Sequence, residues 1–300
     1  MIPFVRELEV AYGRVDAVSP LIRRVIAANP GPFTFTGTGT YIVGRPEPGA
    51  GVAVIDPGPP DDAHLAALLD AVEGQTVSHV LVTHTHRDHS PLARPFAAAV
   101  GAPVLAARPP ARVVHASGAL DEADDEAFAP DEVLCGGEAL AGDGWTLEAM
   151  ATPGHASNHM AFLLREENAL FSGDHVMGWS TTVVAPPDGD MAAYMASLDA
   201  VIARRVSTIW PTHGAPITDP QPFLEAYRTH RLEREAQILG QLATGPHRIM
   251  DMVPTLYAAV DSRLWPAAGL SVWAHLLALE RAGRVGAAPG PDIDALWSLR

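Results

Sequence analysis

Residues 83–89 read Thr-His-Thr-His-Arg-Asp-His and place three histidines and one aspartate within seven positions. The segment directly follows an apolar run at residues 80–82. Imidazole nitrogen and carboxylate oxygen are ligands that a borderline cation such as Zn²⁺ prefers. Because side chains alternate along a strand, His84 and His86 would lie on one face. The segment therefore predicts half of a metal site, and the alternative is a polar loop that merely contains many histidines.

Three more strand-like runs end close to a side chain that can bind a metal. The runs at residues 147–150, 170–172 and 209–210 lead to His155, Asp174 and His213. Each of these ligands lies beside glycine or proline, as expected where a loop must bring a side chain to a fixed point. Four strand ends with the same arrangement predict that the ligands converge on one pocket at the edge of a sheet.

Apolar periodicity predicts an α/β body with much strand over the first 220 residues. Helices are expected at residues 61–73 and 191–204, where apolar side chains recur at helical spacing. Strands are expected at residues 40–43, 52–55, 79–82, 103–106, 146–150, 161–164, 169–172 and 207–210.

A composition shift near Pro220 and Pro222 predicts a division into domains at residues 1–220 and 221–300. Amphipathic helices are expected at 223–242, 249–260 and 270–282, followed by a short extended tail, which together suggest a small winged-helix-like module. This part carries eight arginines and eight acidic side chains. Because the basic and acidic side chains are equal in number, we favour a role of this part in packing or oligomerisation, with nucleic-acid binding as the alternative.

Charge and composition exclude several classes of protein. The formal charge of −15 would repel a polyanion, which argues against a general nucleic-acid-binding surface. Cys135 is the only cysteine, so an intrachain disulfide and a thiolate zinc cluster are excluded. The sequence has neither a long apolar run nor a basic start followed by an apolar stretch. We therefore expect no transmembrane helix, no signal peptide and a cytoplasmic location.

The sequence resembles the metallo-β-lactamase superfamily, whose H-x-H-x-D-H motif is matched within residues 84–89. The downstream ligands match in the same order, and the resemblance spans about residues 30–215. It implies an αβ/βα sandwich with two metals in a shallow cleft between the sheets. The first metal would be held by His84, His86 and His155, the second by Asp88, His89 and His213, and Asp174 would bridge both.

The resemblance also implies the chemistry of the site. Two divalent ions can lower the pKa of a shared water towards ~7, so a metal-bridging hydroxide would attack a carbonyl carbon or a phosphorus. Asp88 would orient this nucleophile. Zn²⁺ is the expected metal, and Mn²⁺ or Fe²⁺ would also suit the donor set.

Four further residues are candidates for supporting roles. Asp56 ends a strand in Asp-Pro-Gly, where the superfamily has an aspartate near its site; it would accept a hydrogen bond from a metal-bound imidazole, or cap a turn. His159 and His175 would orient ligands or substrate, or would be core histidines. Arg87 lies inside the metal motif and would face a substrate phosphate or solvent.

The best match within the superfamily is the branch of lactamase-β-like protein 2, whose known member is an endoribonuclease on single-stranded RNA and whose chain ends in a winged-helix-like module. Arg94, Arg108 and Arg112 could add positive charge near the motif, but the acidic body and an aromatic content of 6% disfavour RNA. The resemblance therefore implies a dinuclear zinc hydrolase of this branch, with phosphodiester and small ester or thioester substrates both open. The alternative is a glyoxalase-II-like thioesterase or lactone hydrolase. A different class is a metal-binding regulatory protein whose site is catalytically idle.

Overall fold

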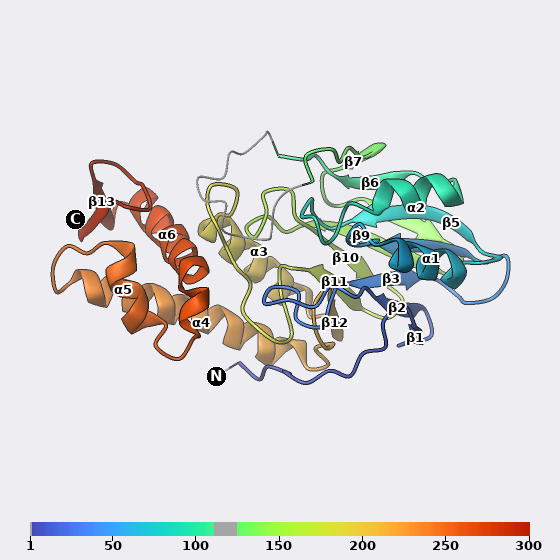
Figure 1. The fold of residues 1–300 in the computed structure, drawn as a ribbon, viewed down its shortest axis with the longest axis horizontal. Coiled ribbons are helices and arrows are strands. Elements are labelled where there is room, and N and C mark those ends of the chain that lie inside the picture. The colour runs from blue at the N-terminus through green and yellow to red at the C-terminus, as the bar shows by residue number, and fades with distance from the viewer. Residues whose placement is uncertain (1, 111–124) are drawn as a thin grey trace.

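The computed structural model describes residues 2–110 and 125–300, and its body consists of two packed sheets flanked by helices (Figure 1). The first sheet has seven strands, antiparallel from β1 to β4 and parallel from β4 to β7. In spatial order they are β1 (Val15–Ala17), β2 (Ile22–Ile26), β3 (Gly39–Val43), β4 (Gly51–Ile55), β5 (Thr76–Val82), β6 (Val104–Ala107) and β7 (Glu132–Leu134).

The second sheet has five strands, of which only β11 and β12 pair in parallel. In spatial order they are β12 (Thr208–Pro211), β11 (Ala169–Gly173), β10 (Met160–Leu164), β9 (Trp145–Ala151) and β8 (Ala139–Gly142). Strand β9 alternates buried and partly buried residues, which is the pattern of a strand with one face towards a core.

Three apolar layers hold the body together. Side chains from both sheets, such as Ile55 and Phe162, meet in a central core. Helices α1 (Asp62–Ala71) and α2 (Ala93–Val100) cover the outer face of the first sheet. Helix α3 (Met191–Arg204) covers the outer face of the second sheet. The chain therefore forms the αβ/βα sandwich that the family resemblance implied.

The C-terminal part contains α4 (Pro220–Leu242), α5 (Ile249–Leu256), the short 3-10 helix η1 (Ser262–Leu264) and α6 (Trp265–Arg281), followed by a hairpin of β13 (Val285–Ala288) and β14 (Leu296–Leu299). Helix α6 begins five residues earlier than expected, because the proline at its start lies in the first turn, where no helical hydrogen bond is lost. Tyr227 of α4 packs in the body, whereas Ile238 packs in a separate C-terminal core. The domain division at 220/221 stays a prediction.

Each expected strand is present, but some elements of the structure are not evident in the sequence. Strand β2 contains Arg23 and Arg24, which interrupt its apolar pattern yet are both buried. The Arg23 guanidinium donates hydrogen bonds to the Ala71 carbonyl (2.8 Å) and to Gln75 Oε1 (2.7 Å). These partners lie about fifty residues away, so no local pattern predicts that the two arginines tolerate burial. In the described part of the chain, no helix is long and apolar enough to cross a membrane.

We expect the central core to dominate the stability of the body. Phe162 is fully buried between the sheets, so Phe162→Ala should lower the free energy of unfolding by about 3–5 kcal/mol. Leu232→Ala is the control, since this side chain is 45% exposed on α4 and should change the same quantity by less than about 0.5 kcal/mol. Denaturant unfolding of both variants in EDTA measures the difference, and similar losses would contradict the proposed role of the core.

Candidate metal centre

The site lies where loops leave strands of both sheets. The loop after β5 in the first sheet carries residues 84–89, and loops after β9, β11 and β12 in the second sheet carry His155, Asp174 and His213. Strands β9, β11 and β12 run in the same direction, so these three loops share one edge. The sequence argument placed all four strand ends at the edge of a single sheet, and this was wrong. The ligands meet across the edges of two packed sheets.

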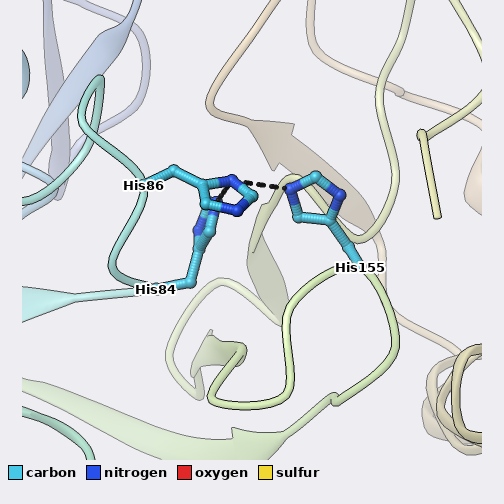
Figure 2. A group of neighbouring side chains, drawn as sticks. All are labelled: His84, His86 and His155. Atoms are coloured by element: carbon cyan, nitrogen blue, oxygen red, sulfur yellow. Dashed lines mark hydrogen bonds between the residues drawn. The ribbon is translucent and has the colours of Figure 1, made fainter. Parts of the chain in front are cut away.

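A first group of ring nitrogens comes from His84, His86 and His155. Nδ1 of His86 lies 2.9 Å from Nε2 of His84 and 3.1 Å from Nε2 of His155. Figure 2 shows His84 and His86 projecting from one loop towards His155 on another, with their nitrogens pointing at one another. Three ring nitrogens this close together can coordinate one cation.

A second group is formed by Asp88, His89 and His213. Oδ2 of Asp88 lies 3.0 Å from Nε2 of His213 and 3.4 Å from Nε2 of His89. The carboxylate of Asp174 lies between the two groups. Its Oδ1 is 3.6 Å from Nε2 of His89 and 3.5 Å from Nε2 of His213, while its Oδ2 is 3.9 Å from Nε2 of His155. The structure thus brings together all seven residues that the sequence singled out as ligands.

Hydrogen bonds on the far side of the rings orient four of the imidazoles. Nδ1 of His89 donates to Asp56 (2.8 Å), Nδ1 of His155 to the Val183 carbonyl (2.7 Å), and Nδ1 of His213 to the Gly37 carbonyl (3.2 Å). Nδ1 of His84 lies 3.0 Å from the Thr83 hydroxyl, whose own proton goes to Asp56. With Nδ1 protonated, each of these rings turns an Nε2 lone pair towards the centre.

Asp56 accepts hydrogen bonds from both sheets. In addition to His89, it accepts from the Thr83 backbone amide (2.7 Å), the Thr83 hydroxyl (2.8 Å) and the Thr212 hydroxyl (3.2 Å). Asp56 thus accepts a hydrogen bond from the imidazole of a proposed ligand, which is the first of the two roles that the sequence suggested for it. Sequence reasoning missed Thr83 and Thr212, although each follows an apolar strand and directly precedes a ligand histidine. That position is the signal that could have identified them.

Burial and mutual repulsion keep part of the centre neutral. Burial, with neighbouring imidazoles, holds the pKa of His84 well below its ordinary value and lowers that of His86 to about 3. Burial also lowers the pKa of His89, but the carboxylates of Asp88 and Asp174 outweigh it, so this pKa is raised. Neutral rings at His84 and His86 have the lone pairs that a metal requires at neutral pH.

Several buried polar atoms of the centre lie within 4 Å of one another and yet form no hydrogen bond within the described part of the chain. Nε2 of His89, Nε2 of His213 and Oδ1 of Asp174 are buried and make no hydrogen bond to a described residue. Unpaired buried groups of this kind are costly, and a divalent cation bound by nitrogen and oxygen would satisfy all three. The donor set therefore fits the metal ions that the sequence implied.

Two further histidines lie behind the ligands. Nε2 of His159 accepts a hydrogen bond from the Asp174 backbone amide (3.1 Å), and its Nδ1 lies 2.8 Å from the Thr152 hydroxyl. His159 therefore orients the backbone of Asp174. His175 is fully buried, packs 4.9 Å from the ring of Tyr194, and is held neutral by burial, which lowers its pKa to about 3. Its surroundings are those of a core histidine.

The arginines near the motif have different surroundings. Arg87 is exposed beside the ligands. Arg94 forms an ion pair with Asp131 (2.7 Å), so its charge is largely balanced. Arg108 is exposed, and Arg112 lies outside the described residues.

Gly154 explains how the loop carrying His155 reaches the centre. Its φ is +142°, and an added Cβ would lie 2.3 Å from Cα of Tyr194 in α3. Only glycine allows the loop to pass so close to the helix backbone. The backbone amide of Asp190, which caps α3, also donates to the Gly154 carbonyl (2.8 Å).

Comparisons with known families cover both parts of the chain. The family model described as "Metallo-beta-lactamase superfamily" matches residues 35–213. The model described as "Beta-lactamase associated winged helix domain" matches residues 249–291, in agreement with the winged-helix-like module expected there.

Two relatives illustrate the sequence similarity. The chain is 31% identical over 289 residues to the "Beta-lactamase-like protein 2 homolog" of Drosophila melanogaster, covering 93% of this chain and 94% of that protein. It is 34% identical over 231 residues to the "Atrochrysone carboxyl ACP thioesterase" of Aspergillus chevalieri, covering 76% of this chain and 68% of that protein.

Two solved structures share the fold. A β-lactamase domain protein from Burkholderia ambifaria matches with a TM-score of 0.80 at 22% identity, covering 100% of this chain and 97% of that one. A metallo-β-lactamase family protein from Thermus thermophilus matches with a TM-score of 0.72 at 23% identity, covering 95% of this chain and 100% of that one.

The role of Asp56 can be tested through metal affinity. Asp56→Asn removes the charge that holds the Nδ1 proton of His89, so the affinity for Zn²⁺ should fall by roughly 10–100-fold. Competition with a chromophoric chelator measures this affinity without any substrate. Asp199→Asn, which alters an exposed ion pair with Arg228, is the control and should leave the affinity within about twofold. Equal affinities in the two variants would show that Asp56 does not support the ligands.

Proposed function

Because this chain belongs to the metallo-β-lactamase superfamily, a family of hydrolases, we propose that its centre holds two divalent metal ions and hydrolyses small esters or thioesters. The observation that carries the proposal is the convergence of seven nitrogen- and oxygen-bearing side chains into groups whose ligand atoms lie within 4.8 Å of one another. In this proposal His84, His86 and His155 hold the first ion.

The second ion would be held by Asp88, His89 and His213. Asp174 would bridge the pair, which is supported by the way its two oxygens face different groups of imidazoles. We propose Zn²⁺ as the metal because imidazole nitrogen dominates the donor set, with Mn²⁺ or Fe²⁺ as alternatives. When bound, two such ions lower the pKa of a shared water and polarise the bond to be cleaved.

The two site carboxylates differ in their access to water. The side chain of Asp88 is 22% exposed and that of Asp174 is 9% exposed. Asp88 can therefore accept a hydrogen bond from the attacking water or hydroxide and orient it, in addition to its proposed role as a ligand. His159 and Thr152 hold the backbone of Asp174, and Asp56 holds the ring of His89, so that the centre keeps its geometry while charge develops on the substrate.

Two observations favour a small acyl substrate over RNA. One relative carries the name of an acyl carrier protein thioesterase, and it matches across most of this chain. The chain is strongly acidic, and one of the arginines close to the motif is already paired with an aspartate. Single-stranded RNA is the alternative that the same experiment tests.

Hydrolysis should depend on the metal and on its ligands. Zinc-loaded protein should cleave an acyl thioester, and EDTA should abolish the activity. His84→Ala should reduce kcat/KM by more than the roughly 10–100-fold that is typical of losing a supporting residue. His79→Ala is the control, since this histidine lies on β5 outside the ligand groups, with its Nδ1 beside the Ser78 hydroxyl (2.9 Å) and its ring edge-on to Trp145.

A panel of substrates separates the alternatives. It includes an acyl thioester, a lactone, a phosphodiester and a fluorogenic single-stranded RNA. Cleavage of RNA with no action on the esters would replace the small-molecule assignment. Protein with two bound metals per chain that cleaves none of them would contradict the enzyme assignment and favour an idle, metal-binding regulatory protein.

A further inference from the structure

A cavity of about 270 Å³ lies between the body and the C-terminal helices. Its walls come from the N-terminal segment, from the loop at residues 177–183 that follows Asp174, from helix α4, and from residues 257–271 around η1 and the start of α6. Its volume is close to the ~300–1,000 Å³ typical of pockets for small molecules. The cavity contains none of the seven proposed metal ligands.

The cavity is basic in an otherwise acidic protein. Arg6, Arg231, Arg234 and His230 line it, and none of the described residues that line it is acidic. The whole chain, in contrast, has 35 acidic residues and 20 basic ones. Burial and the two neighbouring arginines of α4 lower the pKa of His230 to about 4, so this ring is neutral, and no described side chain that lines the cavity carries a negative charge to balance the guanidinium groups.

Buried nitrogens of the lining side chains lack acceptors. Nε of Arg231, Nε of Arg234 and Nε1 of Trp179 are buried and make no hydrogen bond to a described residue. Arg231 itself is only 4% exposed, although one of its terminal nitrogens donates to the Thr182 carbonyl. Buried donors without acceptors are unfavourable, and an anion in the cavity would supply both the acceptors and the opposite charge.

Apart from hydroxyl side chains at Ser180, Thr181, Thr182 and Ser271, the remaining walls are apolar and aromatic. Phe4, Phe33, Trp179 and Tyr257 line the cavity, and the guanidinium of Arg234 lies 4.0 Å from the ring centroid of Tyr257. Trp179 is itself held by stacking on Phe35, with the ring centroids 4.9 Å apart. Such walls favour a ligand with an apolar or aromatic body, whose anionic end meets the arginines.

One wall of the cavity also supports the metal centre. The Thr182 hydroxyl donates to the Asp174 carbonyl (2.8 Å), and the neighbouring Val183 carbonyl accepts from Nδ1 of His155 (2.7 Å). Both residues line the cavity. The same short segment therefore contacts both the cavity and two of the proposed ligands.

We propose that this cavity binds an organic anion with an apolar or aromatic body, bearing a carboxylate or a phosphate, and that this anion is the part of the substrate remote from the bond that is cleaved. The identification of the ligand as substrate rests on the hydrolase function proposed above, whereas the binding site itself does not.

Calorimetric titration of the zinc-loaded protein, with residues 1–300 intact, tests the binding site. The probes are 1-naphthyl phosphate, 1-naphthoate and the neutral 1-naphthalenemethanol. The anions should bind about tenfold or more tightly than the alcohol, as expected for charge-assisted hydrogen bonds. The tighter of the two anions identifies the head group. Binding should persist in EDTA, because the cavity contains no proposed ligand; anion binding that disappears with the metal belongs to the metal centre and would overturn the proposal.

Variants of the arginines provide the decisive comparison. Arg6→Gln and Arg234→Gln should each weaken binding of the anions about tenfold and binding of the alcohol by less than about twofold. Arg6 is exposed, so its replacement should leave folding intact even if Arg234→Gln, which also loses its contact with Tyr257, is destabilised. Arg228→Gln is the matched control on α4, because Arg228 pairs with Asp199 outside the cavity. Anion affinities that do not differ between these variants and the control would overturn the proposal.

Kinetic measurements distinguish the role of the cavity as a substrate-binding site from the proposed hydrolase function of the metal centre. For a pair of thioesters that differ only in a remote carboxylate, Arg6→Gln should raise KM for the anionic substrate about tenfold and KM for the neutral one by less than about twofold. Thioester cleavage without this difference would refute the cavity as a substrate site and leave the hydrolase function standing. Arginine-dependent binding without cleavage of any ester would establish the anion site and refute the hydrolase function.

Discussion

The buried carboxylate of Asp56 connects the two sheets at the edge where the metal ligands meet. It lies at the end of β4 and accepts hydrogen bonds from Thr83 and His89, which follow β5 in the same sheet. It also accepts one from Thr212, which follows β12 in the other sheet. Because all of these partners stand beside or within the ligand set, the packing of the sandwich and the orientation of the imidazoles depend on the same group.

The metal centre and the arginine-lined cavity are neighbouring sites that favour ligands of opposite charge. At the centre, carboxylates and imidazoles converge and leave buried atoms that a cation would satisfy. In the cavity lined by residues 177–183, three guanidinium groups converge, and the buried Nε atoms of Arg231 and Arg234 are donors that an anion would satisfy. A substrate with a cleavable bond and a remote negative charge would meet both environments. The C-terminal helices are needed for the second, since α4 supplies two of its arginines.

The parts of the structure that follow from local sequence were predictable. Helix α3 has the expected bounds because its apolar spacing is regular and Asp190 caps its first turn. The eight strands expected from apolar runs are present, since buried strands of both sheets need such runs. The proposed ligands His84, His155, Asp174 and His213 were recognisable because each follows a strand end within a few residues, where a loop can place it in a site.

The sequence by itself determined an α/β body, the residues that could bind metal and the helical C-terminal part, because periodicity and strand-end motifs are local; the sandwich arrangement followed from the family resemblance. Only the tertiary structure decided that the ligands come from two sheets, that Thr212 and Thr83 share Asp56, and that β2 can bury two arginines. It also decided that Arg6 and Arg231, more than two hundred residues apart in the chain, line one cavity. The physical reason is that a buried charge or donor is defined by partners distant in sequence, which no local pattern specifies.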